Sequence, residues 1–107
     1  LFTLLDVGCG PEVAPEFINL DYFWHPRLDV CWDITRKPYP FADNSLEGIF
    51  TEHCLEHITY EDGLKNMQEF YRMLKPGGVA RIVVPDAEIY LDLYQRKKAG
   101  HTVTMPY

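Results

Sequence analysis

The chain has 107 residues, of which 47% are hydrophobic and 24% are charged, a composition typical of one soluble globular domain. Its formal net charge of -6 argues against nucleic-acid binding, because neutralising phosphates requires a basic face. No apolar run is long enough to span a membrane, no signal peptide is visible, and three widely spaced cysteines favour the reducing environment of the cytoplasm.

The first predicted strand covers residues 2–7 and is an apolar run typical of a buried parallel strand. It contains Asp6 near its end and leads into Gly8 and Gly10. Glycines directly after a strand let the backbone turn tightly and let a ligand approach the main chain. Prolines at positions 11 and 15 break any long helix in the following loop. This glycine pattern alone is a weak signal for a nucleotide-type site.

Three further short strands are predicted before the middle of the chain, and each ends at polar residues. Residues 17–20 lead into Asp21, residues 28–31 lead to Asp33, and a strand within residues 46–51 leads to Glu52 and His53. The carboxyl ends of parallel strands meet at one edge of a sheet, where ligands bind in open α/β folds. We therefore expect these polar side chains and the glycine loop along one edge.

The best-marked helix follows, and Thr59 with Asp62 three residues later resembles a capping box. Apolar residues then recur at helical spacing and predict one buried face, formed by Leu64, Met67, Phe70, Tyr71 and Leu74. Residues 75–78 contain the breakers that end the helix, residues 79–84 form a β-branched strand, and Asp86 caps a last helix to about residue 98.

Strands alternating with helices predict an α/β fold, a Rossmann-like open parallel sheet with flanking helices in a single domain over residues 1–107. Carboxylates at successive strand ends suit a nucleoside: one can accept from ribose hydroxyls, one from an exocyclic amine and one from a cationic group. Each Asp could instead cap a turn or a helix. Val13 replaces the third glycine of a dinucleotide fingerprint, and no P-loop lysine is present. S-adenosylmethionine, which is cationic and lacks phosphate, fits this pattern.

Several motifs resemble the class I S-adenosylmethionine-dependent methyltransferases, most closely the type 11-like predicted methyltransferases. They are the segments LDVGCG (5–10), FINLD (17–21), PYPFADNS (38–45), TEHCLEHI (51–58), MLKPGG (73–78) and VVPD (83–86). The complete family fold has two more strands, so the resemblance implies a domain truncated before the last two strands. The chain also begins almost inside its first strand and is expected to be a piece of a longer protein.

The resemblance implies a role for each matching residue. Asp6, Gly8 and Gly10 would line the methionine and ribose end of the cofactor, and Asp21 would bind the ribose hydroxyls. Tyr22, Asp33 and Ile34 would contact the adenine. Thr51, Glu52 and His53 would border the methyl-transfer face. Catalysis would rest mostly on positioning the acceptor, with His53 and His57 as candidate catalytic bases. No metal is implied, and a small-molecule acceptor is favoured over nucleic acid or a membrane.

Two alternatives remain open from the residues. His53, Glu56 and His57 match H-x-x-E-H, so a zinc hydrolase is possible if both histidines lie on one helix. The second alternative is a non-catalytic Rossmann-like binding module. The incomplete sheet also leaves an open edge through which two copies could pair as a homo-oligomer.

Overall fold

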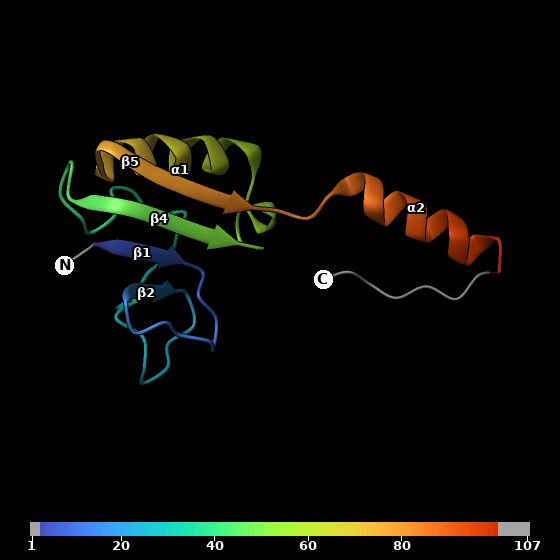
Figure 1. Ribbon diagram of the computed structural model, residues 1–107, viewed down its shortest axis with the longest axis horizontal. Coiled ribbons are helices and arrows are strands. Elements are labelled where there is room, and N and C mark those ends of the chain that lie inside the picture. The colour runs from blue at the N-terminus through green and yellow to red at the C-terminus, as the bar shows by residue number, and fades with distance from the viewer. Residues whose placement is uncertain (1–2, 101–107) are drawn as a thin grey trace.

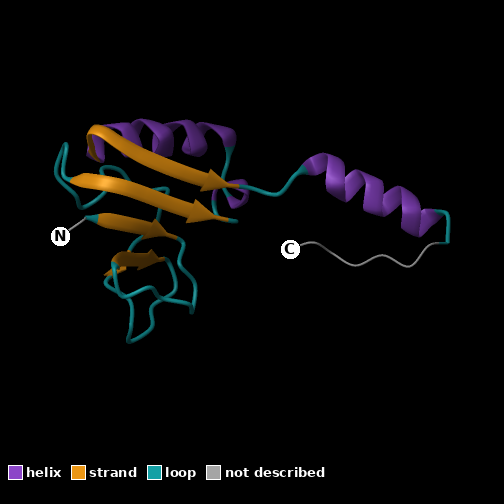
Figure 2. Cartoon of the chain, in the orientation of Figure 1, coloured by secondary structure: helices purple, strands orange, loops and turns teal. Residues whose placement is uncertain are grey.

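The computed structural model of the protein describes residues 3–100. Within this range, five strands form one parallel sheet in the order β3-β2-β1-β4-β5, which confirms the predicted open α/β sheet (Figure 1). The strands are β1 (Leu4–Val7), β2 (Phe17–Asp21), β3 (Val30–Cys31), β4 (Leu46–Glu52) and β5 (Leu74–Val83). The helices are the 3-10 turn η1 (Leu55–His57), α1 (Tyr60–Met73) and α2 (Ala87–Lys98), as Figure 2 shows.

The strand order reverses at β1, which has β2 on one side and β4 on the other. Val7 pairs with Leu20 of β2 and with Thr51 of β4, so these three strands end at nearly the same level. In open parallel sheets the point of reversal leaves a crevice outside the carboxyl ends of the strands. The loops that follow β1, β2 and β4 therefore meet at that crevice.

The core lies between the sheet and α1. It consists of the buried side chains of Leu5, Val7, Leu20, Tyr39, Leu46, Ile49, Phe70 and Met73. Thr59 caps α1 as predicted, since its hydroxyl accepts from the Asp62 amide at 3.2 Å. The predicted apolar face of α1 is wrong in part. Leu64, Met67 and Tyr71 are exposed, and the buried seam runs through Asn66, Phe70 and Met73.

Asn66 explains this rotation of the helix. Its amide donates to the Ile34 carbonyl at 3.0 Å, and its carbonyl oxygen accepts from the Tyr39 hydroxyl. Burying an amide costs little when its hydrogen bonds are satisfied, so a polar residue can occupy the seam that apolar periodicity alone would assign to leucine and methionine.

The boundaries of several elements differ from the predicted ones. β1 begins at Leu4, while Phe2 lies outside the described residues, and β3 covers only two residues. α1 ends at Met73 and continues directly into β5. Pairing with β4 jumps from Leu74 to Val79, so residues 75–78 bulge out of the ladder where the breakers were predicted to end the helix.

No helix occurs within residues 8–16, in agreement with the prolines of that loop.

Asp86 caps α2 as predicted and accepts from the Glu88 amide at 2.9 Å. Figure 1 shows α2 beyond the end of β5, away from the sheet. None of the helices within residues 3–100 is long and apolar enough to cross a membrane.

Candidate functional site

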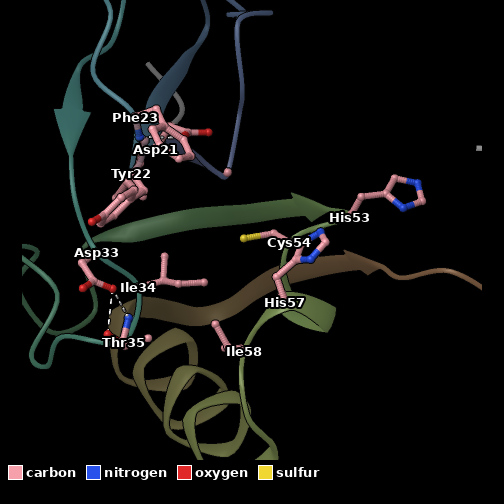
Figure 3. Close-up of a pocket in the computed structure, with 12 residues that line it drawn as sticks. Asp21, Tyr22, Phe23, Asp33, Ile34, Thr35, His53, Cys54, His57 and Ile58 are labelled. Atoms are coloured by element: carbon pink, nitrogen blue, oxygen red, sulfur yellow. Dashed lines mark hydrogen bonds between the residues drawn. The ribbon is translucent and has the colours of Figure 1, made fainter.

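A groove of about 470 Å³ lies at the carboxyl ends of the strands (Figure 3). This volume falls in the range of roughly 300–1,000 Å³ that is usual for small-molecule sites. The groove brings together seven of the predicted site residues, which are Gly8, Asp21, Tyr22, Asp33, Ile34, His53 and His57. Its other lining residues, which the sequence analysis missed, are Leu20, Phe23, Thr35, Cys54 and Ile58.

The glycine loop turns sharply at the end of β1. Gly8 and Gly10 have φ values of +76° and +63°, which side chains disfavour. The Gly8 amide donates to the Leu20 carbonyl at 2.8 Å, and the Gly10 amide donates to Asp21 Oδ2 at 2.8 Å. A Cβ on Gly8 would approach the Cys54 sulfur to 2.8 Å. Glycine is therefore required at position 8 both by the turn and by the packing of Cys54.

Asp21 lies at the end of β2 and faces the groove. Its Oδ1 accepts from the Phe23 amide at 3.0 Å, while Oδ2 holds the Gly10 amide. A carboxylate can accept about four hydrogen bonds, so this orientation leaves acceptor capacity on both oxygens. Tyr22 and Phe23 follow directly, largely exposed, with their rings edge to face at 5.1 Å.

The loop after β3 forms the opposite wall. Asp33 Oδ1 accepts from the Thr35 amide at 2.9 Å and from its hydroxyl at 2.7 Å, and these bonds lower the pKa of Asp33. The carboxylate is therefore charged near neutral pH and suited to accept from an amine. The Ile34 carbonyl already accepts from Asn66 and Lys37.

An acidic hollow of about 280 Å³ adjoins the groove and shares Gly8 and His53 with it. Asp6, Glu12 and Glu52 line this hollow. Burial raises the pKa of Asp6, and the charges of Glu52 and Asp21 raise it further. A cationic group placed there would relieve this repulsion, so the donor set suits an ammonium or a sulfonium and opposes a phosphate.

His53 stands between the groove and the acidic hollow, just after β4. Its φ of +53° is uncommon for a residue with a side chain, and its amide donates to the Val83 carbonyl at 2.9 Å. The ring lies between two carboxylates, with Nε2 3.6 Å from Glu52 and Nδ1 3.6 Å from Glu56. In Figure 3, His57 points toward Cys54, whereas His53 projects past the end of β4.

Four predicted site residues lie outside the groove. Asp6 and Glu52 line the acidic hollow, and Gly10 lines a neighbouring pocket with residues 23–27. Thr51 is 1% exposed, and its hydroxyl donates to the Val7 carbonyl at 2.9 Å. Its side chain thus joins β1 to β4 inside the sheet and does not line the groove.

The missed residue Thr35 had a recognisable signal, because Asp followed two residues later by a hydroxyl or amide donor is a common local turn. Cys54 gave no comparable signal, since its place in the groove depends on the turn at His53.

The H-x-x-E-H alternative requires both histidines on one helix. η1 contains only Leu55–His57, and His53 lies before it in a left-handed conformation. Within residues 3–100, no group of three or more His, Cys, Asp or Glu side chains is arranged to hold a metal ion. The two histidines therefore do not share a helix, the placement that a zinc site of the H-x-x-E-H type requires.

A parallel sheet with a glycine loop after β1 and carboxylates at the carboxyl ends of β2 and β3 defines an open α/β domain with a groove at the position where such folds bind small molecules. Comparison with known proteins narrows this class. Residues 19–82, more than half of the chain, match a family model described as methyltransferase domain. The chain belongs to this family of methyltransferase domains, which confirms the class I methyltransferase resemblance.

Two curated relatives illustrate the similarity. The chain is 32% identical over 76 residues to a demethylmenaquinone methyltransferase of Chlorobaculum parvum. This alignment covers 71% of the chain and 30% of that protein. It is 32% identical to phosphoethanolamine N-methyltransferase 2 of Caenorhabditis elegans, over 77% of the chain and 23% of that protein. The matched segments thus span less than a third of the length of these relatives.

Proposed function

We propose that this domain binds S-adenosylmethionine in the groove and serves a methyl transfer from the cofactor sulfonium to a small-molecule acceptor. The observation that carries this proposal is the set of carboxylates Asp21, Asp33 and Asp6, spread along one edge beside a glycine loop that no helix follows. A pyrophosphate needs the N-terminus of that missing helix, whereas adenosine with a cationic side chain does not. The family match supports the same ligand.

In this proposal each wall of the groove binds one part of the cofactor. Asp21 accepts from the ribose hydroxyls, and Asp33 accepts from the adenine amine, with Ile34 and Tyr22 on either side of the ring. Asp6 and Glu52 in the acidic hollow attract the methionine ammonium. Gly8 lines the groove without a side chain, so the backbone there can approach the ligand closely.

The cofactor supplies an electrophilic methyl group, and the protein supplies position and, for some acceptors, a proton acceptor. We propose His53 as that base, because its ring lies at the wall between groove and hollow. Glu56, 3.6 Å from Nδ1, would orient the ring. His57, three-quarters exposed and 4.0 Å from the same carboxylate, is the second candidate.

The names of the relatives point to demethylmenaquinone and phosphoethanolamine as their acceptors, and both are small molecules. We extend this acceptor class to the present chain. The net charge of -6 opposes a nucleic-acid acceptor.

The free thiols of Cys9, Cys31 and Cys54 support a cytoplasmic location. Pairing of two copies along the β5 edge also stays a proposal.

The proposal is tested by calorimetry with S-adenosylmethionine on the protein and on Asp21→Asn, with EDTA present. We expect a Kd in the micromolar range, about -8 kcal/mol. Asp21→Asn should bind at least about 30-fold more weakly, because it loses the charge that strengthens the ribose hydrogen bonds. Asp92→Asn, on the exposed surface of α2, is the matched control and should bind normally.

Absence of binding by the folded protein would contradict the proposal. Binding without release of S-adenosylhomocysteine in the presence of quinone or amine acceptors would favour the non-catalytic module instead.

A further inference from the structure

The glycine loop is held without a helix. Residues 8–16 connect β1 to β2 with no helical turn, although in nucleotide-binding α/β folds a helix normally follows this loop and fixes it. Unsupported loops with two positive-φ glycines would sample many conformations, and each binding event would then have to order them. Other contacts must therefore hold this loop in the shape that forms the site.

Each end of the loop is attached to β2. At the first end, the amides of Gly8 and Cys9 donate to the Leu20 carbonyl at 2.8 and 3.1 Å. At the other end, the side chain of Asn19 receives the Ala14 amide at 3.1 Å and donates to the Ala14 carbonyl at 2.9 Å. In the middle of the loop, β2 contributes the Asp21 carboxylate, which accepts from the Gly10 amide at 2.8 Å, whereas the carbonyls of Gly10 and Pro11 are bound from elsewhere.

Two side chains from the loop after β2 hold this middle part. His25 Nε2 lies 3.0 Å from the Gly10 carbonyl, and Arg27 Nη2 donates to the Pro11 carbonyl at 2.7 Å. Because a carbonyl only accepts, Nε2 of His25 must carry the proton. Nδ1 accepts from the Arg27 amide at 3.3 Å, which agrees with the neutral tautomer protonated on Nε2.

These contacts bear directly on Asp21. The Gly10 amide donates to Asp21 Oδ2, and His25 binds the carbonyl of the same Gly10. The orientation of the Gly10 peptides thus depends on both side chains. Displacing Gly10 would remove one of the two backbone bonds that orient the Asp21 carboxylate toward the groove.

We propose that His25 and Arg27 are positioning residues that clasp the glycine loop and so orient Asp21 for cofactor binding. The proposal rests on the function proposed above. It assigns to the two side chains the task that a helix performs in longer versions of this loop. Neither residue lines the groove, so each acts through the loop and not by touching the ligand.

The test compares His25→Ala, His25→Gln and Arg27→Ala with the unchanged protein. Amide hydrogen exchange at Gly8, Cys9, Gly10, Glu12 and Val13 reports the order of the loop, and calorimetry reports the affinity for S-adenosylmethionine. His25→Ala should accelerate exchange at these amides and weaken binding by about tenfold, the effect of losing one hydrogen bond. Arg27→Ala should act in the same direction.

His25→Gln should restore most of both properties, because its amide nitrogen can donate to the Gly10 carbonyl in place of Nε2. Tyr71→Ala is the matched control, since it removes an exposed ring from α1, and it should change neither readout. Normal exchange and affinity in His25→Ala would overturn the proposal. So would faster exchange across the whole sheet, which would indicate general destabilisation, or a loss of affinity that glutamine does not restore.

If the unchanged protein does not bind S-adenosylmethionine, the function proposed above fails. Exchange at the glycine loop in His25→Ala then still decides whether the clasp orders the loop.

Discussion

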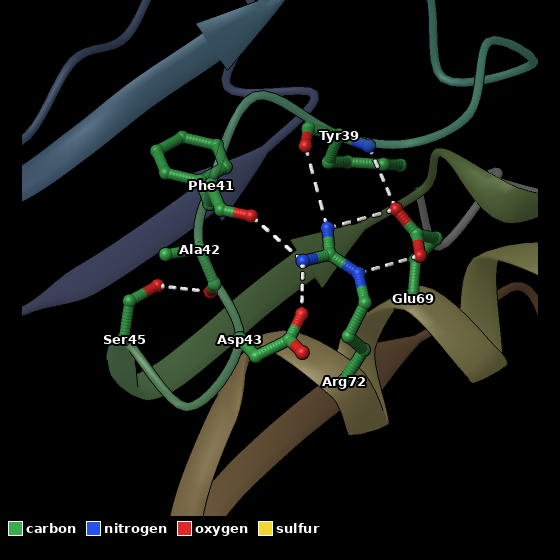
Figure 4. Close-up of polar contacts among 7 residues, drawn as sticks. All are labelled: Tyr39, Phe41, Ala42, Asp43, Ser45, Glu69 and Arg72. Atoms are coloured by element: carbon green, nitrogen blue, oxygen red, sulfur yellow. Dashed lines mark hydrogen bonds and ion pairs between the residues drawn. The ribbon is translucent and has the colours of Figure 1, made fainter.

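Two connections in this domain are held by polar side chains, but in contrasting surroundings. The turn at residues 38–43 is fixed to α1 by Arg72 (Figure 4). The guanidinium makes two bonds to Glu69, at 2.8 and 3.0 Å, and one each to Asp43 and to the carbonyls of Phe41 and Tyr39. Tyr39 itself is buried in the core.

The glycine loop differs in each of these respects. Its middle part depends on single hydrogen bonds: the Gly10 amide donates to Asp21, while His25 and Arg27 donate to the carbonyls of Gly10 and Pro11, and Arg27 is exposed. The difference suggests a division of labour. The turn next to the core is held by several bonds to one guanidinium, whereas the loop at the groove is held by fewer contacts, as ligand-binding segments commonly are.

The largest effect on stability is expected from Arg72→Leu. Removing the guanidinium takes the Arg72 hydrogen bonds from two carbonyls and from Glu69, which keeps the Tyr39 amide, and this should cost about 2–3 kcal/mol in the free energy of unfolding. Urea unfolding measures this loss. Arg96→Ala is the control, because Arg96 pairs with Asp92 on the surface of α2 and should contribute less than about 0.5 kcal/mol. Equal losses in both variants would remove the contrast between the two connections.

Gly8→Ala should come next, at about 1–2 kcal/mol, because it forces a side chain into positive φ and against the Cys54 sulfur. Thermal unfolding measures it. Adding Cys54→Ala should recover part of the loss by relieving the contact. The control Gly63→Ala lies in α1 with open space around it and should instead stabilise the protein by up to about 1 kcal/mol. A neutral Gly8→Ala would show that the loop adapts.

The hydrogen bonds between Arg72 and Glu69 should also make the free energy of unfolding depend on pH in the acid range. Hydrogen bonds from Arg72 hold the pKa of Glu69 below its ordinary value. The contribution of Glu69 is therefore complete above the unfolded-state pKa of about 4.3, and it is lost as the pH falls through the lower folded-state pKa. The free energies of unfolding of the protein and of Glu69→Gln should differ by about 1 kcal/mol at pH 6, and this difference should disappear as the pH falls. Thermal unfolding of both proteins from pH 6 downward measures it. Parallel curves would contradict this assignment.

The smallest effect concerns chemical reactivity and not stability. Burial, helped by the charges of Asp21 and Asp6, raises the pKa of Cys9 to about 11. At pH 8 its thiolate fraction should be roughly 100-fold below that of an ordinary thiol, so iodoacetamide should label Cys9 far more slowly than the exposed Cys31. Mass spectrometry of the labelled peptides measures both rates in one sample. Similar rates would mean that the glycine loop opens readily.

The sequence predicted the parts of the site that depend on strand ends. Asp21 ends β2, and Asp33 and His53 follow β3 and β4. The rule for parallel sheets brings such residues together without any knowledge of side-chain packing. The cap of α1 was predictable for a similar reason, since Thr59 and Asp62 interact over three residues.

Features that depend on contacts between distant segments were not predictable. Thr51 was expected at the ligand, but strand alternation turns it into the sheet, where it bonds to Val7. The buried face of α1 was misplaced because Asn66 meets Ile34 and Tyr39, which are distant in the sequence. Apolar periodicity takes no account of such a partner, and so it assigned the seam to residues that are exposed.

The bulge between α1 and β5 offers a place for protein engineering. Pairing with β4 resumes at Val79 after residues 75–78 leave the ladder, and a Cβ on Gly77 would meet no atom within 4 Å. This corner lies at the amino end of β5, opposite the groove. A short reporter tag inserted between Pro76 and Gly77 should therefore leave both the strand register and the binding site as they are, giving a handle for immobilising the domain with its groove facing the solution.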